Sequence, residues 1–94
     1  MKRMPKPTKA ELIMMLLNQW DPAHGADNDF RFYQVEAEEI AQKIRKNSNL
    51  ESVENAVREA ISLRMELENV KEPFDEDACK GYSEWILLAI KKQK

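Results

Sequence analysis

The spacing of apolar residues constrains this chain most, because it repeats at the period of an α-helix in four separate segments. Proline, glycine and asparagine cluster between these segments. No window alternates apolar and polar residues as a half-buried strand does, and the hairpin signals Asn-Gly and Asp-Gly are missing. We therefore predict an all-α fold, a compact bundle of four amphipathic helices. The predicted helices cover residues 7–20, 29–46, 49–69 and 76–92.

Each predicted helix begins at a residue whose side chain can accept a hydrogen bond from a free backbone N–H. Two of the starts are capping boxes, Thr8 with Glu11 and Ser48 with Glu51. The other two are the single N-cap residues Asp29 and Asp75. The chain should leave the first helix at Trp20, because the residue before a proline, here Asp21 before Pro22, avoids the helical region.

The apolar stripes give the predicted core. The stripe of the second helix is Tyr33, Ala37, Ile40, Ala41 and Ile44. That of the third is Leu50, Val53, Ala56, Val57, Ala60, Ile61, Leu63 and Leu67. That of the fourth is Ala78, Cys79, Tyr82, Trp85, Ile86, Ala89 and Ile90. Gly81 interrupts the fourth helix at a cost of about 1 kcal/mol relative to alanine, and we expect another helix or a bulky ring to approach it closely.

Charge is distributed unevenly along the 94 residues, which are enough for a single domain, residues 1–94. Residues 11–90 hold all 17 acidic residues and sum to −9, whereas the ends are basic and bring the net charge to −2. We predict frayed basic tails at residues 1–7 and 92–94. An acidic body repels phosphate, so no nucleic-acid partner is predicted.

The rare residues exclude several chemistries. One histidine, one cysteine and two glycines cannot supply a two-imidazole site, a disulfide framework or a phosphate-binding glycine loop. We predict no catalytic residue, no cofactor and no metal, and a buried Cys79. The apolar run of residues 12–17 is too short for a membrane span or a signal peptide. We therefore expect a cytoplasmic protein with no membrane partner.

Acidic residues of the second helix leave one enzymatic alternative. Glu36-x-x-Glu39 resembles the E-x-x-E motif of all-α nucleotide pyrophosphatases, which hold magnesium with carboxylates. On a helical wheel, however, Glu36 lies roughly 85° and Glu39 about 145° from the centre of the apolar stripe. We predict that both face solvent. The loop of residues 21–29, with His24 and three aspartates, is interpreted as a hydrogen-bonded loop, with metal binding as the alternative.

Arg64 lies only about 20° from the centre of the third stripe, where an unpaired charge cannot be buried. Three interpretations stay open. The guanidinium reaches solvent at the end of the bundle, or it pairs with an acid of a neighbouring helix or loop, or it recognises an anion in a cleft.

Several apolar residues lie away from the predicted core faces. Met14 lies about 160° from the other apolar residues of its helix, and Leu87 and Leu88 flank the fourth stripe on its outer side. Such residues are buried in a tightly wrapped monomer or contact a second copy or a protein partner.

Two motifs resemble a known family. Leu17-Asn18-Gln19-Trp20-Asp21-Pro22 is similar to the L-N-x-W-D-P signature of the YugE-like family of small uncharacterised bacterial proteins. Residues 32–37 are similar to its F-Y-x-x-E-A, and Pro73 with Cys79 to its last helix. The resemblance implies a compact helical fold and no particular activity, cofactor or catalytic residue.

The function predicted from the sequence is that of a non-catalytic protein acting through protein contact or self-association. An immunity or antitoxin-like protein, whose acidic body covers a basic toxin, is the alternative, with a magnesium-dependent pyrophosphatase behind it. The candidate interaction or structural residues are Trp20, Asp21, Pro22, Tyr33, Glu36, Arg64, Met14, Leu87 and Leu88.

Overall fold

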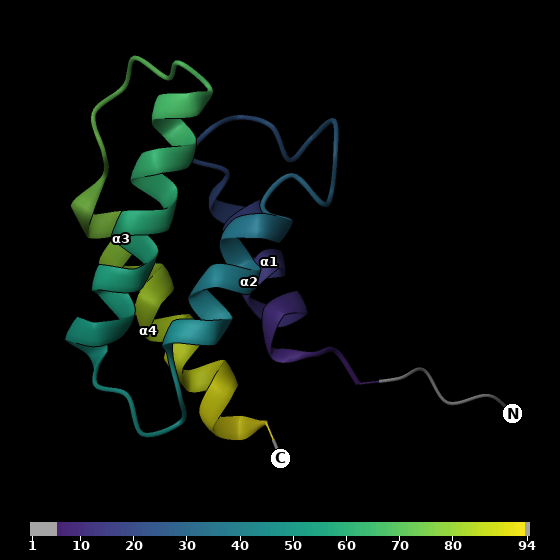
Figure 1. Cartoon of the computed structure of the whole chain (residues 1–94), viewed down its shortest axis with the longest axis vertical. Coiled ribbons are helices and arrows are strands. Elements are labelled where there is room, and N and C mark those ends of the chain that lie inside the picture. Colours follow the sequence, from purple (N-terminus) through teal and green to yellow (C-terminus); the bar gives the residue numbers. More distant parts are fainter. Residues whose placement is uncertain (1–5, 94) are drawn as a thin grey trace, which may run out of the picture.

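The computed structural model describes residues 6–93, and within that range the chain forms four α-helices and no strand. The helices are α1 (Lys9–Trp20), α2 (Gln34–Lys43), α3 (Leu50–Leu67) and α4 (Glu76–Lys92). The predicted all-α bundle is confirmed, and successive helices run in opposite directions (Figure 1). Of the predicted basic tails, residues 1–5 and 94 lie outside the described range. Lys92 is the last residue of α4, and the Gln93 amide donates to the Pro7 carbonyl over 2.9 Å.

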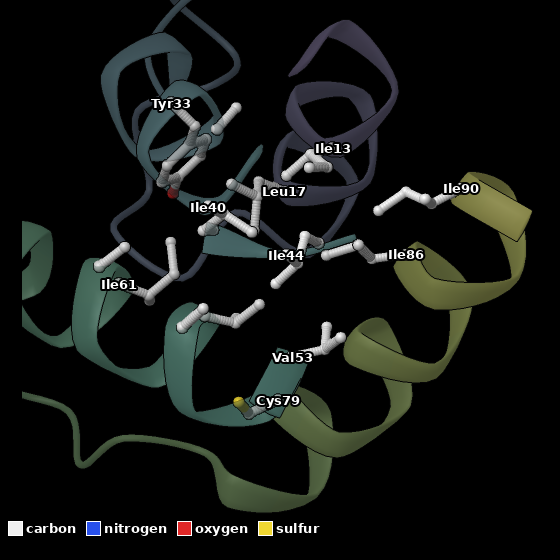
Figure 2. Close-up of a cluster of buried hydrophobic side chains, with 14 of the residues drawn as sticks. Ile13, Leu17, Tyr33, Ile40, Ile44, Val53, Ile61, Cys79, Ile86 and Ile90 are labelled. Carbon is white, nitrogen blue, oxygen red and sulfur yellow. The ribbon is translucent and has the colours of Figure 1, made fainter. Parts of the chain in front are cut away.

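Each helix contacts two others, so the four enclose one core. The closest backbone approaches join α1 to α2, α2 to α3, α3 to α4 and α4 to α1, whereas within residues 6–93 no Cα atoms of the diagonal pairs lie within 8 Å of each other. Figure 2 shows the core, with side chains from all four helices meeting in one cluster. The ten labelled residues are Ile13, Leu17, Tyr33, Ile40, Ile44, Val53, Ile61, Cys79, Ile86 and Ile90.

Two leucines predicted to belong to the core of α3 are exposed. Leu63 is 54% and Leu67 69% exposed, while Met65 is buried. The last turns of α3 extend past the start of α4 (Figure 1), so no helix covers that side. A helical period shows which residues share a face, but the position of the neighbouring helix decides how far along the face is covered.

The second helix begins and ends inside its predicted range, at Gln34 and Lys43. The Asp29 carboxylate accepts from the Arg31 N–H over 2.9 Å, and the Asp29 carbonyl accepts from the Phe32 N–H over 3.0 Å. These bonds fold residues 29–33 into turns, so Asp29 is not the N-cap of α2. At the other end Ile44 is extended, with φ −115° and ψ 153°, and its side chain is buried.

Hydrogen bonds confirm two of the remaining predicted caps and contradict the third. Thr8 and Glu11 form the predicted capping box, and Asp75 caps α4 by accepting from the Ala78 N–H. The box of Ser48 with Glu51 is wrong, because Asn49 accepts from the Ser52 N–H over 2.8 Å and is the N-cap. The Ser48 hydroxyl instead accepts from the Arg45 N–H.

Asn69 ends α3 in a left-handed conformation with φ 58°. Its N–H donates to the Glu66 carbonyl and the Val70 N–H donates to the Met65 carbonyl. This pair of bonds is the Schellman motif, which pairs the last carbonyls of a helix.

Within residues 6–93, no helix is both long and apolar enough to cross a membrane.

Replacement of Leu17 by alanine should lower the free energy of unfolding by about 3 kcal/mol, because a fully buried leucine leaves a cavity among rigid neighbours. The measurement is urea denaturation followed by circular dichroism. Met15→Ala, on the same helix but 59% exposed, is the matched control and should change stability little. Equal effects of the two substitutions would contradict the orientation of α1.

Candidate functional site

Asp21 organises the junction between α1 and the long loop that follows it. The residue is left-handed, with φ 49° and ψ 55°, and its N–H donates to the Leu17 carbonyl over 2.7 Å. Its Oδ1 accepts from the N–H groups of Gly25 at 2.9 Å and Ala26 at 3.0 Å. It also accepts from the Tyr33 hydroxyl at 2.8 Å. The Trp20-Asp21-Pro22 segment thus ends α1 as predicted, and the Asp21 carboxylate serves the fold.

Tyr33 connects this loop to the core. Its side chain is fully buried, and its hydroxyl oxygen accepts from the Ala23 N–H over 2.8 Å while its proton goes to Asp21. Burial and the neighbouring carboxylate raise the pKa of Tyr33 well above its usual value. The hydroxyl therefore stays protonated and remains a hydrogen-bond donor. This hydrogen bond joins Tyr33, at the start of α2, to the Trp20-Asp21-Pro22 segment.

Glu36 is buried, in contrast to the predicted solvent-facing position. It is 6% exposed, and its carboxylate lies 4.0 Å from the Arg64 guanidinium of α3. The packing of α2 on α3 covers the flank of the apolar stripe, so a residue well off its centre is still buried. Glu39 is exposed as predicted. Burial raises the pKa of Glu36, and the Arg64 charge partly opposes this shift.

Arg64 lies between two carboxylates and an aromatic ring. Glu68, one turn further on α3, lies 3.6 Å from its Nε, and the guanidinium carbon lies 4.0 Å from the centre of the Phe32 ring. The Arg64 side chain is 22% exposed. Of the three interpretations of Arg64, this arrangement matches the ion pair with an acid of a neighbouring helix. Two carboxylates beside the cation also disfavour a bound anion.

Two buried atoms of this pair have no hydrogen-bond partner among residues 6–93, namely Glu36 Oε1 and Arg64 Nε. The fold therefore holds the two charges near one another without close hydrogen bonds. The Phe32 ring also lies against Gly25, where a Cβ would overlap the ring. We call Asp21, Tyr33, Glu36 and Arg64 the polar junction.

The metal alternative for the loop of residues 21–29 finds no support in the side-chain positions of the described residues. No three His, Cys, Asp or Glu side chains between residues 6 and 93 lie close enough to share a metal ion. His24 instead contacts Glu72, with 2.8 Å between Nε2 and Oε2, and this contact raises the pKa of His24. Cys79 is buried as predicted, and burial raises the pKa of its thiol. Its Sγ faces Ser83 Oγ and the Glu54 carbonyl, which do not act as bases for a thiol.

A second set of side chains forms an aromatic row between α1 and α4. The Trp20 ring stacks on Tyr82, with 5.4 Å between centroids and 8° between planes. Trp85 meets Tyr82 edge-on at 5.7 Å, and Phe74 meets Trp20 edge-on at 5.9 Å. Trp20 is half-buried and packs against the edge of the core. Trp85, predicted to be a core residue, is 52% exposed.

The solvent-facing side of α4 carries the apolar end of this row. The buried residues of α4 are Cys79, Ser83, Ile86 and Ile90, and at 100° per residue Gly81 and Leu88 point about 170° away from them. Leu88 is 53% exposed. We define the outer face of α4 as Asp77, Gly81, Glu84, Trp85, Leu88 and Lys92. All six are exposed.

Gly81 does not have the close neighbour that was expected of it. A Cβ at this position would meet no atom within 4 Å apart from its own helix and chain neighbours. The space beside it is a hollow of about 380 Å³ lined by Ala78, Gly81, Tyr82, Glu84 and Trp85. Nothing within the described chain therefore explains a glycine in the middle of this helix.

Of the apolar residues predicted to lie away from the core faces, two pack against the core and one is exposed. Met14 is half-buried beside a groove of about 280 Å³ between α1 and α2, and it packs on the core. Leu87 also packs against the core, so the prediction that it points outward is wrong, whereas Leu88 is exposed as predicted. The exposed positions of Gly81 and Trp85 were not predicted from the sequence. The sequence did indicate that Gly81 is unusual, because a glycine inside a helix destabilises that helix relative to alanine.

Glu36→Gln should change how stability varies with pH. Because burial raises the pKa of folded Glu36 above its usual 4.5, its stabilising contribution is complete below that pH and is lost as pH rises through the raised value. The glutamine variant does not titrate, so it should gain stability relative to the natural chain from acid to neutral pH. Urea denaturation over a pH series measures this. Glu39→Gln is the exposed control, and a constant difference for Glu36→Gln would contradict the burial.

Gly81→Ala should raise the free energy of unfolding by up to about 1 kcal/mol, because alanine favours the helix and its methyl group enters open space. Denaturation of dilute protein, where self-association is negligible, measures the change. Lys80→Ala, at the neighbouring exposed position, should have a much smaller effect. A loss of stability in Gly81→Ala would show that this side of α4 is covered within the monomer.

Protein-family models, curated protein sequences and solved structures give no match to this chain.

Proposed function

We propose that this protein is a protein-binding helical module, without catalysis of its own, that contacts another polypeptide through the outer face of α4. The single observation that carries the proposal is the solvent-facing combination of Gly81, Trp85 and Leu88. A solvated helix face is ordinarily polar, and contiguous exposed apolar groups beside a hollow are typical of contact surfaces.

The polar junction supports a binding role without catalysis, because its polar groups already interact with one another and with the loop. The Asp21 carboxylate and the Tyr33 hydroxyl are engaged in bonds that close the loop, and the Glu36 carboxylate faces Arg64. These four residues are among those predicted from the sequence as interaction or structural candidates. Their interactions account for them through folding, whereas the exposed residues Trp85 and Leu88 on the outer face of α4 have no such explanation.

The chemistry of this face favours contact with protein. Tryptophan is enriched in protein interfaces, because a rigid amphipathic ring buries a large area at small entropic cost. Asp77 and Glu84 are acidic and Lys92 is basic, so the face lacks the uniform positive charge that nucleic acid or anionic lipid requires.

The proposal includes two expectations from the sequence. The buried single thiol is consistent with action in the reducing cytoplasm. The resemblance to the YugE-like family stays a prediction. In the fold, the two motifs that carry the resemblance are in contact, because Tyr33 of the second motif donates a hydrogen bond to Asp21 of the first.

Site-specific photocrosslinking in cells that make the full chain tests the proposal. A benzophenone amino acid at position 88 should give a covalent adduct with a polypeptide. The same group at Leu63, an equally exposed leucine of α3, is the matched control and should not. The adduct should also disappear when Gly81→Leu fills the adjoining hollow. Absence of any adduct from position 88, or equal adducts from both positions, would overturn the proposal.

A further inference from the structure

We propose that the outer face of α4 receives a second copy of this chain, with the two α4 helices antiparallel about a two-fold axis between Glu84 and Trp85. This inference rests on the proposed function and names its partner. Three independent features of the face carry it: the spacing of its residues, the shape around Gly81 and the placement of its charges.

The residues of the face are spaced symmetrically about one midpoint. Asp77 and Lys92, Gly81 and Leu88, and Glu84 and Trp85 are pairs equidistant from the point between residues 84 and 85. The steps along the row are of three or four residues except for the single step between Glu84 and Trp85, and at 100° per residue all six lie within a sector of about 100° of the helix surface. In a two-fold antiparallel contact, each residue meets the other member of its pair on the second copy.

The shapes of the central pairs are complementary. Gly81 leaves open space, because a Cβ there would meet no atom within 4 Å other than its chain neighbours and its own helix backbone, and Leu88 is a projecting side chain that is 53% exposed. In the proposed register, each Leu88 enters the hollow beside Gly81 of the other chain. Trp85 lines that hollow and lies next to the axis, so the two indole rings cover the centre of the contact. A glycine at this place allows the two helix backbones to approach closely.

The charges at the two ends of the row are also complementary. The register places Asp77 of one copy next to Lys92 of the other, twice in each dimer. Asp77 lies in the first turn of α4 and Lys92 in the last, and neither forms an ion pair with any residue between 6 and 93. The arrangement also brings the positive end of each helix dipole next to the negative end of the other.

These features favour a second copy over an unrelated partner. An unrelated protein needs only one half of each complementary pair on this chain. Here one face holds both halves of two pairs, hollow with projection and acid with base, at mirrored positions. A single helix-on-helix contact is small among protein interfaces, so we expect a reversible dimer whose population rises with concentration.

Sedimentation equilibrium of the full chain over a concentration series, with four variants, tests the register. Asp77→Lys alone and Lys92→Asp alone should each weaken dimerisation about tenfold, because each places like charges together at two points in the dimer. The double variant Asp77→Lys with Lys92→Asp should return to within about twofold of the natural chain. Both changes are unfavourable to the helix dipole, so recovery cannot come from a more stable α4.

Gly81→Leu is the fourth variant. It tests the register at the middle of α4, so its result does not depend on charge changes at the ends of the helix. Leucine favours the helix and adds exposed apolar surface, so non-specific stickiness would increase association. The proposed register instead predicts a loss of tenfold or more, because the hollow is filled. Lys80→Asp is the matched control for Lys92→Asp, with the same charge change on the same helix but off the outer face, and it should leave dimerisation unchanged.

The outcomes separate this inference from the proposed function. A dimer whose double charge variant does not recover, or one strengthened by Gly81→Leu, overturns the antiparallel register. A strict monomer at every concentration overturns the second copy as partner. If position 88 then still crosslinks to a different polypeptide, the proposed function stands without this inference. If position 88 gives no adduct, both fail.

Discussion

The hydrogen bonds accepted by Asp21 Oδ1 are the interaction on which the rest of the arrangement depends. One oxygen receives two backbone N–H groups of the loop and the hydroxyl of Tyr33. It therefore fixes where α1 ends, how the chain turns and where α2 begins. Without an acceptor at this point, the buried hydroxyl and the loop N–H groups would be unpaired, which is costly in a low-dielectric interior.

From this junction the polar and apolar parts of the protein separate. Arg64 and Glu36 place a charge pair between α3 and α2 next to Phe32, while the aromatic row of Trp20, Tyr82 and Trp85 runs along α1 and α4. The groups that resemble chemical machinery are engaged inside the fold. On the outer face of α4, by contrast, Trp85 and Leu88 are exposed beside the open space at Gly81, and the proposals of function and of self-recognition therefore concern that face.

Much of the fold followed from local rules. The helical period identified four helices, and the Thr8 box, the Asp75 cap and the end of α1 at Trp20 depend on interactions within a few residues. The two predicted caps that were wrong, at Asp29 and Ser48, failed because another hydrogen bond competed for the side chain. Asp29 and Ser48 offered good caps, but each side chain was used by a neighbouring turn, and only the three-dimensional path of the loop selects between such competing bonds.

The sequence by itself determined the number and type of the elements, the identity of most core residues and the burial of Cys79, because periodicity and capping act over short distances. Only the tertiary structure decided which flank of each stripe is covered. It buried Glu36 against Arg64, left Trp85 and Leu67 exposed and showed open space beside Gly81. The physical reason is that burial of a helix flank depends on where neighbouring helices lie and end, and that is set by packing between segments distant in sequence.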